Sequence, residues 1–172
     1  GFPKLARRTR LRIGQTVEGA QVPDRSCVVS AASQAGKTFD STGAGVFVFA
    51  PFLNQLKFDG VLRSARLPGT KAIPAKSYLL SFLALKLLGT ERFAHAGDHG
   101  FDAGLGLFAG LNVLPKCTAM STYSYSLDQD HITRLQRAMV RCASKLGLYK
   151  KDVLNLDFHT AVHNGDEAVL EK

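Results

Sequence analysis

The stretch over residues 78–88 constrains the fold more than any other part of the chain. Its residues are almost all apolar, and Lys86 is its one charged residue. Pro74 suits the first turn of a helix and Gly89 suits its end, so the sequence predicts a helix over residues 75–88. A helix that is apolar on nearly every side must be surrounded by other elements. We therefore expect this helix to form the buried centre of a bundle.

Proline and glycine residues divide the surrounding region, residues 45–116, into short segments. The sequence predicts a helix over residues 46–58, started or interrupted by Pro51, and then a turn at Leu67-Pro68-Gly69. A glycine-rich apolar segment over residues 101–111 precedes a break at Pro115. This punctuation favours a bundle of short helices. The longest apolar runs are shorter than the roughly 20 residues that a transmembrane helix needs, so we expect no membrane span.

The clearest amphipathic pattern lies over residues 129–146. Asp128 suits the N-cap of a helix and Gly147 suits its end. One predicted face is apolar and is made of Ile132, Leu135, Met139, Ala143 and Leu146. A second stripe is basic and is made of Arg134, Arg137, Arg141 and Lys145. A basic stripe at this spacing suits a DNA backbone, although solvated helix faces carry the same pattern.

The charge of the whole chain also favours an anionic partner. There are 22 Lys and Arg residues against 14 Asp and Glu residues, which gives a formal charge of +8. Nucleic acid is one such partner, and a basic solvated surface is the alternative. Cys27, Cys117 and Cys142 are far apart and lack metal-ligand spacing, so they indicate reduced thiols in a cytosolic protein.

Residues 1–43 are expected to form an irregular basic arm. They are rich in Gly, Ser, Thr and Arg and show little periodicity. A cluster of cations within the first 12 residues could lie on phosphates or belong to a solvated terminus. Its members are Lys4, Arg7, Arg8, Arg10 and Arg12.

Within this arm, residues 31–38 read AASQAGKT, which has the outline of a phosphate-binding P-loop with Lys37. A P-loop needs a strand before it and a helix that opens directly after Lys-Thr. Gly43 and Gly45 would cut such a helix short, and the following residues show no alternation of strands and helices. A P-loop nucleotide hydrolase is therefore the least favoured reading.

The pattern changes again over residues 152–160, which are rich in Val and Leu and are followed by Asn164-Gly165. We predict a strand and then a turn. Asp157 lies near the end of this strand, where a rigid backbone suits a carboxylate ligand of Mg²⁺. His159 and His163 lie close by and either assist such a site or serve in packing.

A second candidate metal site is formed by His95, His99 and Asp102, which would share one side of a helix. Gly97 and Gly100 weaken such a helix, so the alternative is a polar loop. Tyr123 and Tyr125 could touch a DNA backbone, but packing between helices is the favoured use. These alternatives stay open at the level of sequence.

Several segments together resemble the DDE transposases of bacterial insertion sequences. The most specific is Phe108-Ala-Gly-Leu-Asn-Val-Leu-Pro115, within the longer run of residues 101–116. Residues 83–89 and Asn155-Leu-Asp-Phe-His-Thr160 add to it, as do residues 165–166 and 171–172. The resemblance covers about residues 44–172 and leaves the arm unmatched.

The composition and punctuation described above predict a mainly α chain, with the irregular basic arm followed by a bundle of short helices. The resemblance implies that residues 44–149 form a helical, DNA-binding N-terminal domain. Residues 150–172 would begin a ribonuclease-H-like α/β catalytic domain, here truncated after its first strand. In that family the first strand carries the first acid of an Asp-Asp-Glu triad, and Asp157 matches this position as catalytic residue and metal ligand. The implied cofactor is Mg²⁺ or Mn²⁺, and two such ions cut and join DNA phosphodiesters.

The match to the triad is incomplete, since Asp166, Glu167 and Glu171 follow Asp157 too closely to replace the missing acids. We therefore expect a fragment that is catalytically inert alone. Its expected partner is the double-stranded DNA of transposon ends, with no membrane and with a homodimer in the full-length protein. The implied location is the cytoplasm, at the nucleoid. The alternative is a helical DNA-binding or interaction module without catalysis.

Overall fold

The computed structural model describes residues 25–38, 41–90 and 93–149. Asp157, His159 and His163, with the whole predicted strand over residues 152–160, lie outside these ranges. The described elements are helical, apart from one isolated antiparallel bridge between Val28 and Leu111. The prediction of a mainly α fold is thus confirmed for the described part of the chain. In chain order the helices are α2 (Ala31–Gln34), η1 (Ala44–Phe49), α3 (Ala50–Gln55), α4 (Phe58–Ala65), α5 (Ala75–Leu87), η2 (Phe93–Asp98), α6 (Ala103–Phe108), α7 (Cys117–Tyr125) and α8 (Gln129–Lys145).

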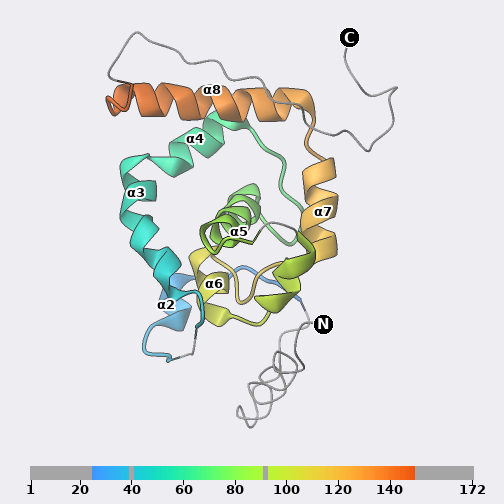
Figure 1. Ribbon diagram of the computed structural model, residues 1–172. Helices are drawn as coiled ribbons and strands as arrows, with labels where there is room; N and C mark the ends of the chain where they lie inside the picture. The colour runs from blue at the N-terminus through green and yellow to red at the C-terminus, as the bar shows by residue number, and fades with distance from the viewer. Residues whose placement is uncertain (1–24, 39–40, 91–92, 150–172) are drawn as a thin grey trace, which may run out of the picture.

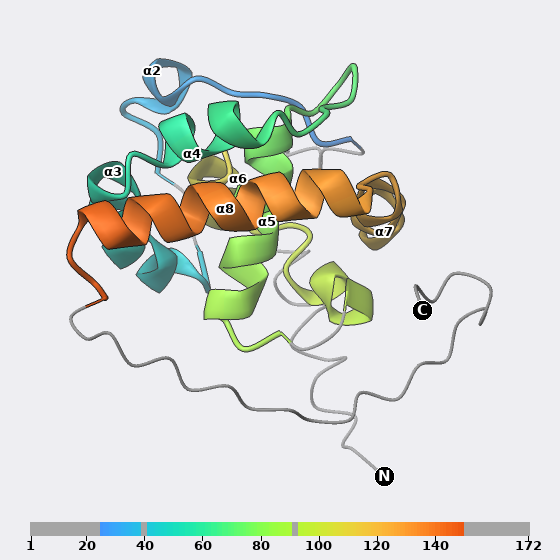
Figure 2. The same ribbon diagram turned by 90° about the horizontal axis from the view of Figure 1, so that it is seen from above.

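Helix α5 lies at the centre of the bundle, as the sequence predicts. Figure 1 shows it end-on, with α3, α4, α8, α7 and α6 arranged around it, and Figure 2 shows it passing beneath α8. Ala84 is fully buried on α5, and Leu85 is 2% exposed. Pro74 precedes the first turn, and Gly89 takes a left-handed φ of +73° after the last turn. Both helix boundaries therefore lie where proline and glycine indicate.

The predicted single helix over residues 46–58 is wrong, because the chain forms three shorter elements there. η1 passes directly into α3, which has Pro51 in its first turn. Lys57 then takes a left-handed φ of 48°, so the chain turns after α3 and α4 starts in a new direction. Arg66, with a φ of 52°, ends α4 in the same way. Left-handed backbone at a residue other than glycine gives little signal in a sequence.

The glycine-rich run after residue 101 is closely packed within the bundle. Leu105 and Leu111 are fully buried, and Leu114 is 2% exposed. Gly106 of α6 faces the backbone of the following loop so closely that a Cβ would lie 2.6 Å from Val113 Cα. The segment that carries the resemblance is therefore part of the hydrophobic core.

The described end of the predicted arm packs against this core segment. Asn112 N–H donates to Cys27 O (3.0 Å), and Val29 N–H donates to Gly110 O (3.1 Å), on either side of the Val28–Leu111 bridge. The Asn112 side chain accepts from Cys27 N–H (2.7 Å), and its amide donates to Arg25 O (3.2 Å). Residues 25–29 are thus attached to the helical region, although the sequence predicts an irregular arm there.

Helix α7 was not predicted, although it buries Met120 and Tyr123. It starts directly after Pro115 and Lys116, and its own residues are mainly Ser, Thr and Tyr. Tyr123 packs between helices, as the favoured reading of this residue predicts, whereas Tyr125 is 89% exposed. No helix in the described ranges has the length and apolar content needed to cross a membrane.

Candidate nucleic-acid interface

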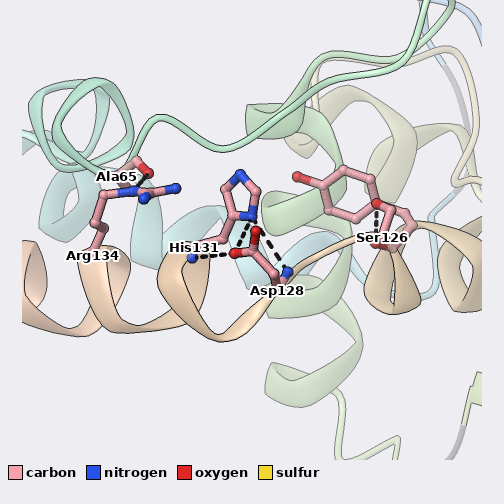
Figure 3. A network of polar contacts seen from close by, with 6 residues as sticks. Ala65, Ser126, Asp128, His131 and Arg134 are labelled. Atoms are coloured by element: carbon pink, nitrogen blue, oxygen red, sulfur yellow. Dashed lines mark hydrogen bonds and ion pairs between the residues drawn. The ribbon is translucent and has the colours of Figure 1, made fainter.

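Helix α8 begins with a reciprocal cap, as Figure 3 shows. Asp128 Oδ1 accepts a hydrogen bond from His131 N–H (2.7 Å) and lies 2.5 Å from His131 Nδ1. This backbone hydrogen bond is the main reason why the pKa of Asp128 lies below its ordinary value, and the nearby His131 and Arg134 charges add to it. The cap fixes the first turn of α8 and therefore the orientation of the basic side chains on the turns that follow.

The ring of His131 has two contacts that require different protonation. Its Nδ1 faces Asp128 N–H at 3.3 Å, which needs a lone pair, and Asp128 Oδ1 at 2.5 Å, which needs a proton. The carboxylate contact is the shorter of the two. A ring with hydrogen on Nδ1 donates to the carboxylate, and a ring without hydrogen there accepts from the backbone. Either arrangement holds the N-terminus of α8.

Helices α4 and α8 pack side by side in opposite directions. Arg134 Nε donates to Ala65 O (3.1 Å) at the end of α4, whereas Cys142 Sγ donates to Leu56 O (2.8 Å) before its start (Figure 3 for the first contact). The Arg134 charge lies beside the carbonyl end of α4, where cations are favourable. Arg134 therefore ties α8 to the bundle.

The predicted basic stripe is consequently divided into two parts. Arg134 is partly buried against α4, whereas Arg137, Arg141 and Lys145 are exposed. Arg137 and Arg141 border a shallow depression of about 350 Å³ on the outer side of α8. Its other lining residues are Thr133, Gln136 and Val140. A surface with these two guanidinium groups and short polar side chains can receive phosphate oxygens.

The apolar face of α8 is rotated relative to the predicted stripe. Ala138 is 8% exposed, whereas Met139 and Leu146, which the sequence places on the apolar face, are 37% and 39% exposed. The small side chains of Ala138 and Cys142 allow α8 to approach α4 closely. Periodicity alone favours the larger apolar residues for the buried face of α8, because the local sequence carries no information on the shape of the neighbouring helix.

Asp102 accepts five hydrogen bonds from other described residues. The sequence does not predict this structural role. Oδ2 accepts from Thr42 N–H (2.7 Å), Thr42 Oγ1 (3.0 Å) and Gly43 N–H (3.2 Å). Oδ1 accepts from Ser41 Oγ (2.8 Å) and Leu105 N–H (2.9 Å). Burial raises the pKa of Asp102, but the hydrogen bonds from Leu105, Ser41 and Thr42 outweigh it, so the pKa lies below its ordinary value.

This arrangement does not support the predicted metal site of His95, His99 and Asp102. Asp102 is the N-cap of α6 and not a member of a helix with the two histidines, and η2 ends at Asp98. His95 is exposed, and His99 Nε2 lies 3.5 Å from Thr90 Oγ1. Throughout the described residues, no group of three or more His, Cys, Asp or Glu side chains is placed to hold a metal ion.

Lys37 also lacks the surroundings of a P-loop. A short helix, α2, lies before it and is capped by Ser30, whose Oγ accepts from Ser33 N–H (3.1 Å). Gly36 has a φ of +76°, and Lys37 N–H donates to Gln34 O (3.1 Å) in the turn that follows α2. A P-loop has the reverse order, with the helix starting at the lysine. Nothing in this geometry favours a phosphate at Lys37.

Comparison of the chain with family models, curated proteins and solved structures finds no match. The functional proposal therefore depends on the residues of this chain. Among the predicted site residues that the structure describes, three are exposed on α8 and one, Arg134, is tied to α4. Asp157 lies outside the described residues.

Proposed function

We propose that this chain is the N-terminal portion of a DDE transposase of the bacterial insertion-sequence type, and that its helical region binds double-stranded DNA at transposon ends. The observation that carries the DNA-binding part is the exposed row of Arg137, Arg141 and Lys145 on α8. Successive members are four residues apart, or about 6 Å along the helix axis. Each can therefore approach a different phosphate when α8 lies against a DNA backbone.

Arg134 has a different part in this proposal. Its Nε donates to Ala65 O, so it holds α8 in place, and the phosphate contacts fall to the three exposed cations. A helix that is fixed at its first turn by Asp128 and along its side by Arg134 presents its outer face in one orientation. Such preorganisation reduces the conformational entropy that is lost when DNA binds.

The catalytic part of the proposal assigns Asp157 as the first acid of the triad, within a ribonuclease-H-like domain that starts at about residue 150. Mg²⁺ or Mn²⁺ would there activate the attacking oxygen and stabilise the leaving one. Two ions need several shared carboxylates, and Asp157 is the residue of this chain that matches the family's triad. The 172-residue chain is accordingly proposed to bind DNA without cutting it.

The alternative function is a helical DNA-binding or interaction module with no link to catalysis. It uses the same α8 surface, so DNA binding does not separate the two. The neighbouring genomic DNA does, since a transposase origin requires inverted repeats and downstream codons for the remaining Asp and Glu. Absence of both would favour the module.

The DNA-binding proposal is tested by fluorescence anisotropy with a labelled DNA duplex over a range of salt concentrations. Arg137→Gln and Arg141→Gln should each weaken binding and reduce the slope of log affinity against log salt by about 1. Lys71→Gln is the matched control, because it removes one exposed charge from the loop before α5. Salt-independent binding, or an equal loss in the control, would contradict the proposal.

A further inference from the structure

A second surface, away from the outer face of α8, is an open groove of about 710 Å³. One side is formed by Val28, Val29 and the end of α6, and the other by α3, the first turns of α4 and the start of α5. Much of its lining is apolar, and Val28 and Phe47 are 56% and 38% exposed. Its apolar lining includes Val29, Leu53, Phe58, Leu80 and Phe108.

The charges around this groove are unbalanced. Lys57, Arg63 and Lys76 line it together with a single acid, Asp59. Lys76 Nζ and Asp59 Oδ1 are 2.6 Å apart, so these two charges compensate each other. Lys57 and Arg63 are exposed, and neither belongs to the ion pairs formed among the described residues. The groove thus carries a net positive charge beside an apolar floor.

Val28, which lines this groove, also has a backbone N–H and C=O without a hydrogen bond to any other described residue. The hydrogen bonds of its bridge are made by its neighbours, Cys27 O and Val29 N–H, with Asn112 and Gly110. In an antiparallel pair of this type, the N–H and C=O of the intervening residue point away from the partner strand. The N–H and C=O of Val28 therefore lie on an edge to which another extended segment can be added.

From these three observations, we infer that the groove binds an extended acidic polypeptide segment, which adds beside Val28 and places alternate apolar side chains on the groove floor. Its acidic side chains are neutralised by Lys57 and Arg63 at the rim. A polypeptide fits better than a nucleic acid, because the floor is apolar and the edge offers peptide hydrogen bonds. This surface is separate from the α8 row, so the inference goes beyond the proposed DNA-binding function and does not depend on it.

The test uses the full chain and a fluorescent peptide of alternating aspartate and leucine, with binding followed by anisotropy. A dissociation constant of about 10–100 µM is expected for such a short segment. A peptide with alternate backbone nitrogens methylated keeps its side chains but cannot pair with Val28. A peptide with serine for leucine keeps its charge but loses the apolar contacts. Both should bind at least about tenfold more weakly.

Two protein variants locate the peptide and separate this inference from the DNA proposal. Arg63→Glu should weaken peptide binding about three- to tenfold, whereas Arg137→Glu makes the same charge change on α8 and should leave it unchanged. DNA binding should show the reverse pattern. Both residues are exposed, and circular dichroism checks that both variants remain folded.

Three outcomes of the peptide experiments would each overturn the inference, and so would one outcome of the DNA experiments. The peptide outcomes are no peptide binding up to about 1 mM, equal binding of the methylated peptide, and equal loss in Arg63→Glu and Arg137→Glu. If DNA instead loses affinity on Arg63→Glu and displaces the peptide, the groove is a nucleic-acid site. That result would refute the inference while leaving DNA binding intact.

Discussion

The aromatic rings of Tyr78 and Tyr123 are stacked, with centroids 4.0 Å apart and planes inclined by 4°. This contact joins the central helix α5 to α7, and both side chains are buried. Tyr123 Oη has no hydrogen-bond partner among the described residues. Burial, with a smaller contribution from Tyr78, raises the pKa of Tyr123 to about 12.

Replacing this hydroxyl should stabilise the protein. Tyr123→Phe keeps the stacked ring and removes a buried unpaired hydroxyl, so the free energy of unfolding should rise by about 1 kcal/mol. Tyr123→Ala removes the ring as well and should lower it by about 3–5 kcal/mol. Urea denaturation followed by circular dichroism measures both. A loss of stability in Tyr123→Phe would show that the hydroxyl has a partner.

The same residue predicts an alkaline limit of stability. Its pKa is about 12 in the folded chain against 10.0 for an unperturbed tyrosine, so the unfolded state ionises first. The contribution of Tyr123 to the free energy of unfolding is therefore fully present below pH 10.0 and should be lost as pH rises toward 12. Tyr123→Phe should reduce this fall, which denaturation midpoints across that range would measure. An unchanged fall would assign it to other groups.

Asp102 is predicted to be the most important single carboxylate for the fold. Asp102→Asn removes the charge and turns an amide group toward backbone and hydroxyl donors, so it should destabilise the chain by about 3 kcal/mol. Because the pKa of Asp102 is lowered, its contribution is present above pH 3.8 and is lost as pH falls through the folded-state pKa. The exposed Asp130→Asn is the control and should change stability by less than about 0.5 kcal/mol. Similar effects of both substitutions would contradict this role.

The close approach of α6 to the following loop predicts opposite effects of one substitution at two glycines. Gly106→Ala places a Cβ 2.6 Å from Asn112 O and Val113 Cα, and should destabilise by about 3 kcal/mol. Gly60 lies within α4 and has open space around it, so Gly60→Ala should stabilise by about 0.5–1 kcal/mol. Thermal denaturation of the two variants tests the packing, and equal shifts in melting temperature would refute it.

The two arginines at positions 134 and 137 should separate stability from DNA binding. Arg134→Gln loses the bond to Ala65 O and should reduce stability by about 1 kcal/mol. Arg137→Gln should change stability by less than about 0.5 kcal/mol, yet reduce the salt dependence of DNA binding. Denaturation and anisotropy on the same samples provide both values. A large loss of stability in Arg137→Gln would show that its side chain is not free on the surface.

The sequence predicted the central helix and α8 well, because both have strong patterns and clear ends at Pro74, Gly89, Asp128 and Gly147. It failed between residues 46 and 66, where Lys57 and Arg66 take left-handed conformations that neither residue favours. It also missed α7, whose buried residues are too few to produce a period.

The sequence identifies the cations of α8 but does not predict which of them are exposed. Helical spacing placed four cations in one row, and three of them are exposed on α8. The fourth, Arg134, is diverted by the carbonyl end of α4, and this neighbour is invisible in the local sequence. Helical spacing from His95 and His99 is what favours Asp102 as a metal ligand. Its donors at residues 41–43 are about 60 positions away in the chain, so local sequence does not reveal them.

The contact between α6 and the segment before η1 links residue sizes at distant positions. A side chain at Gly104 would meet Ser41 Oγ and Cβ, and one at Gly43 would meet the Leu105 side chain. Any gain in volume on one side therefore requires a loss on the other. In related sequences, positions 41 and 104 should vary together, as should positions 43 and 105. Such covariation would show from sequences alone that these positions are in contact.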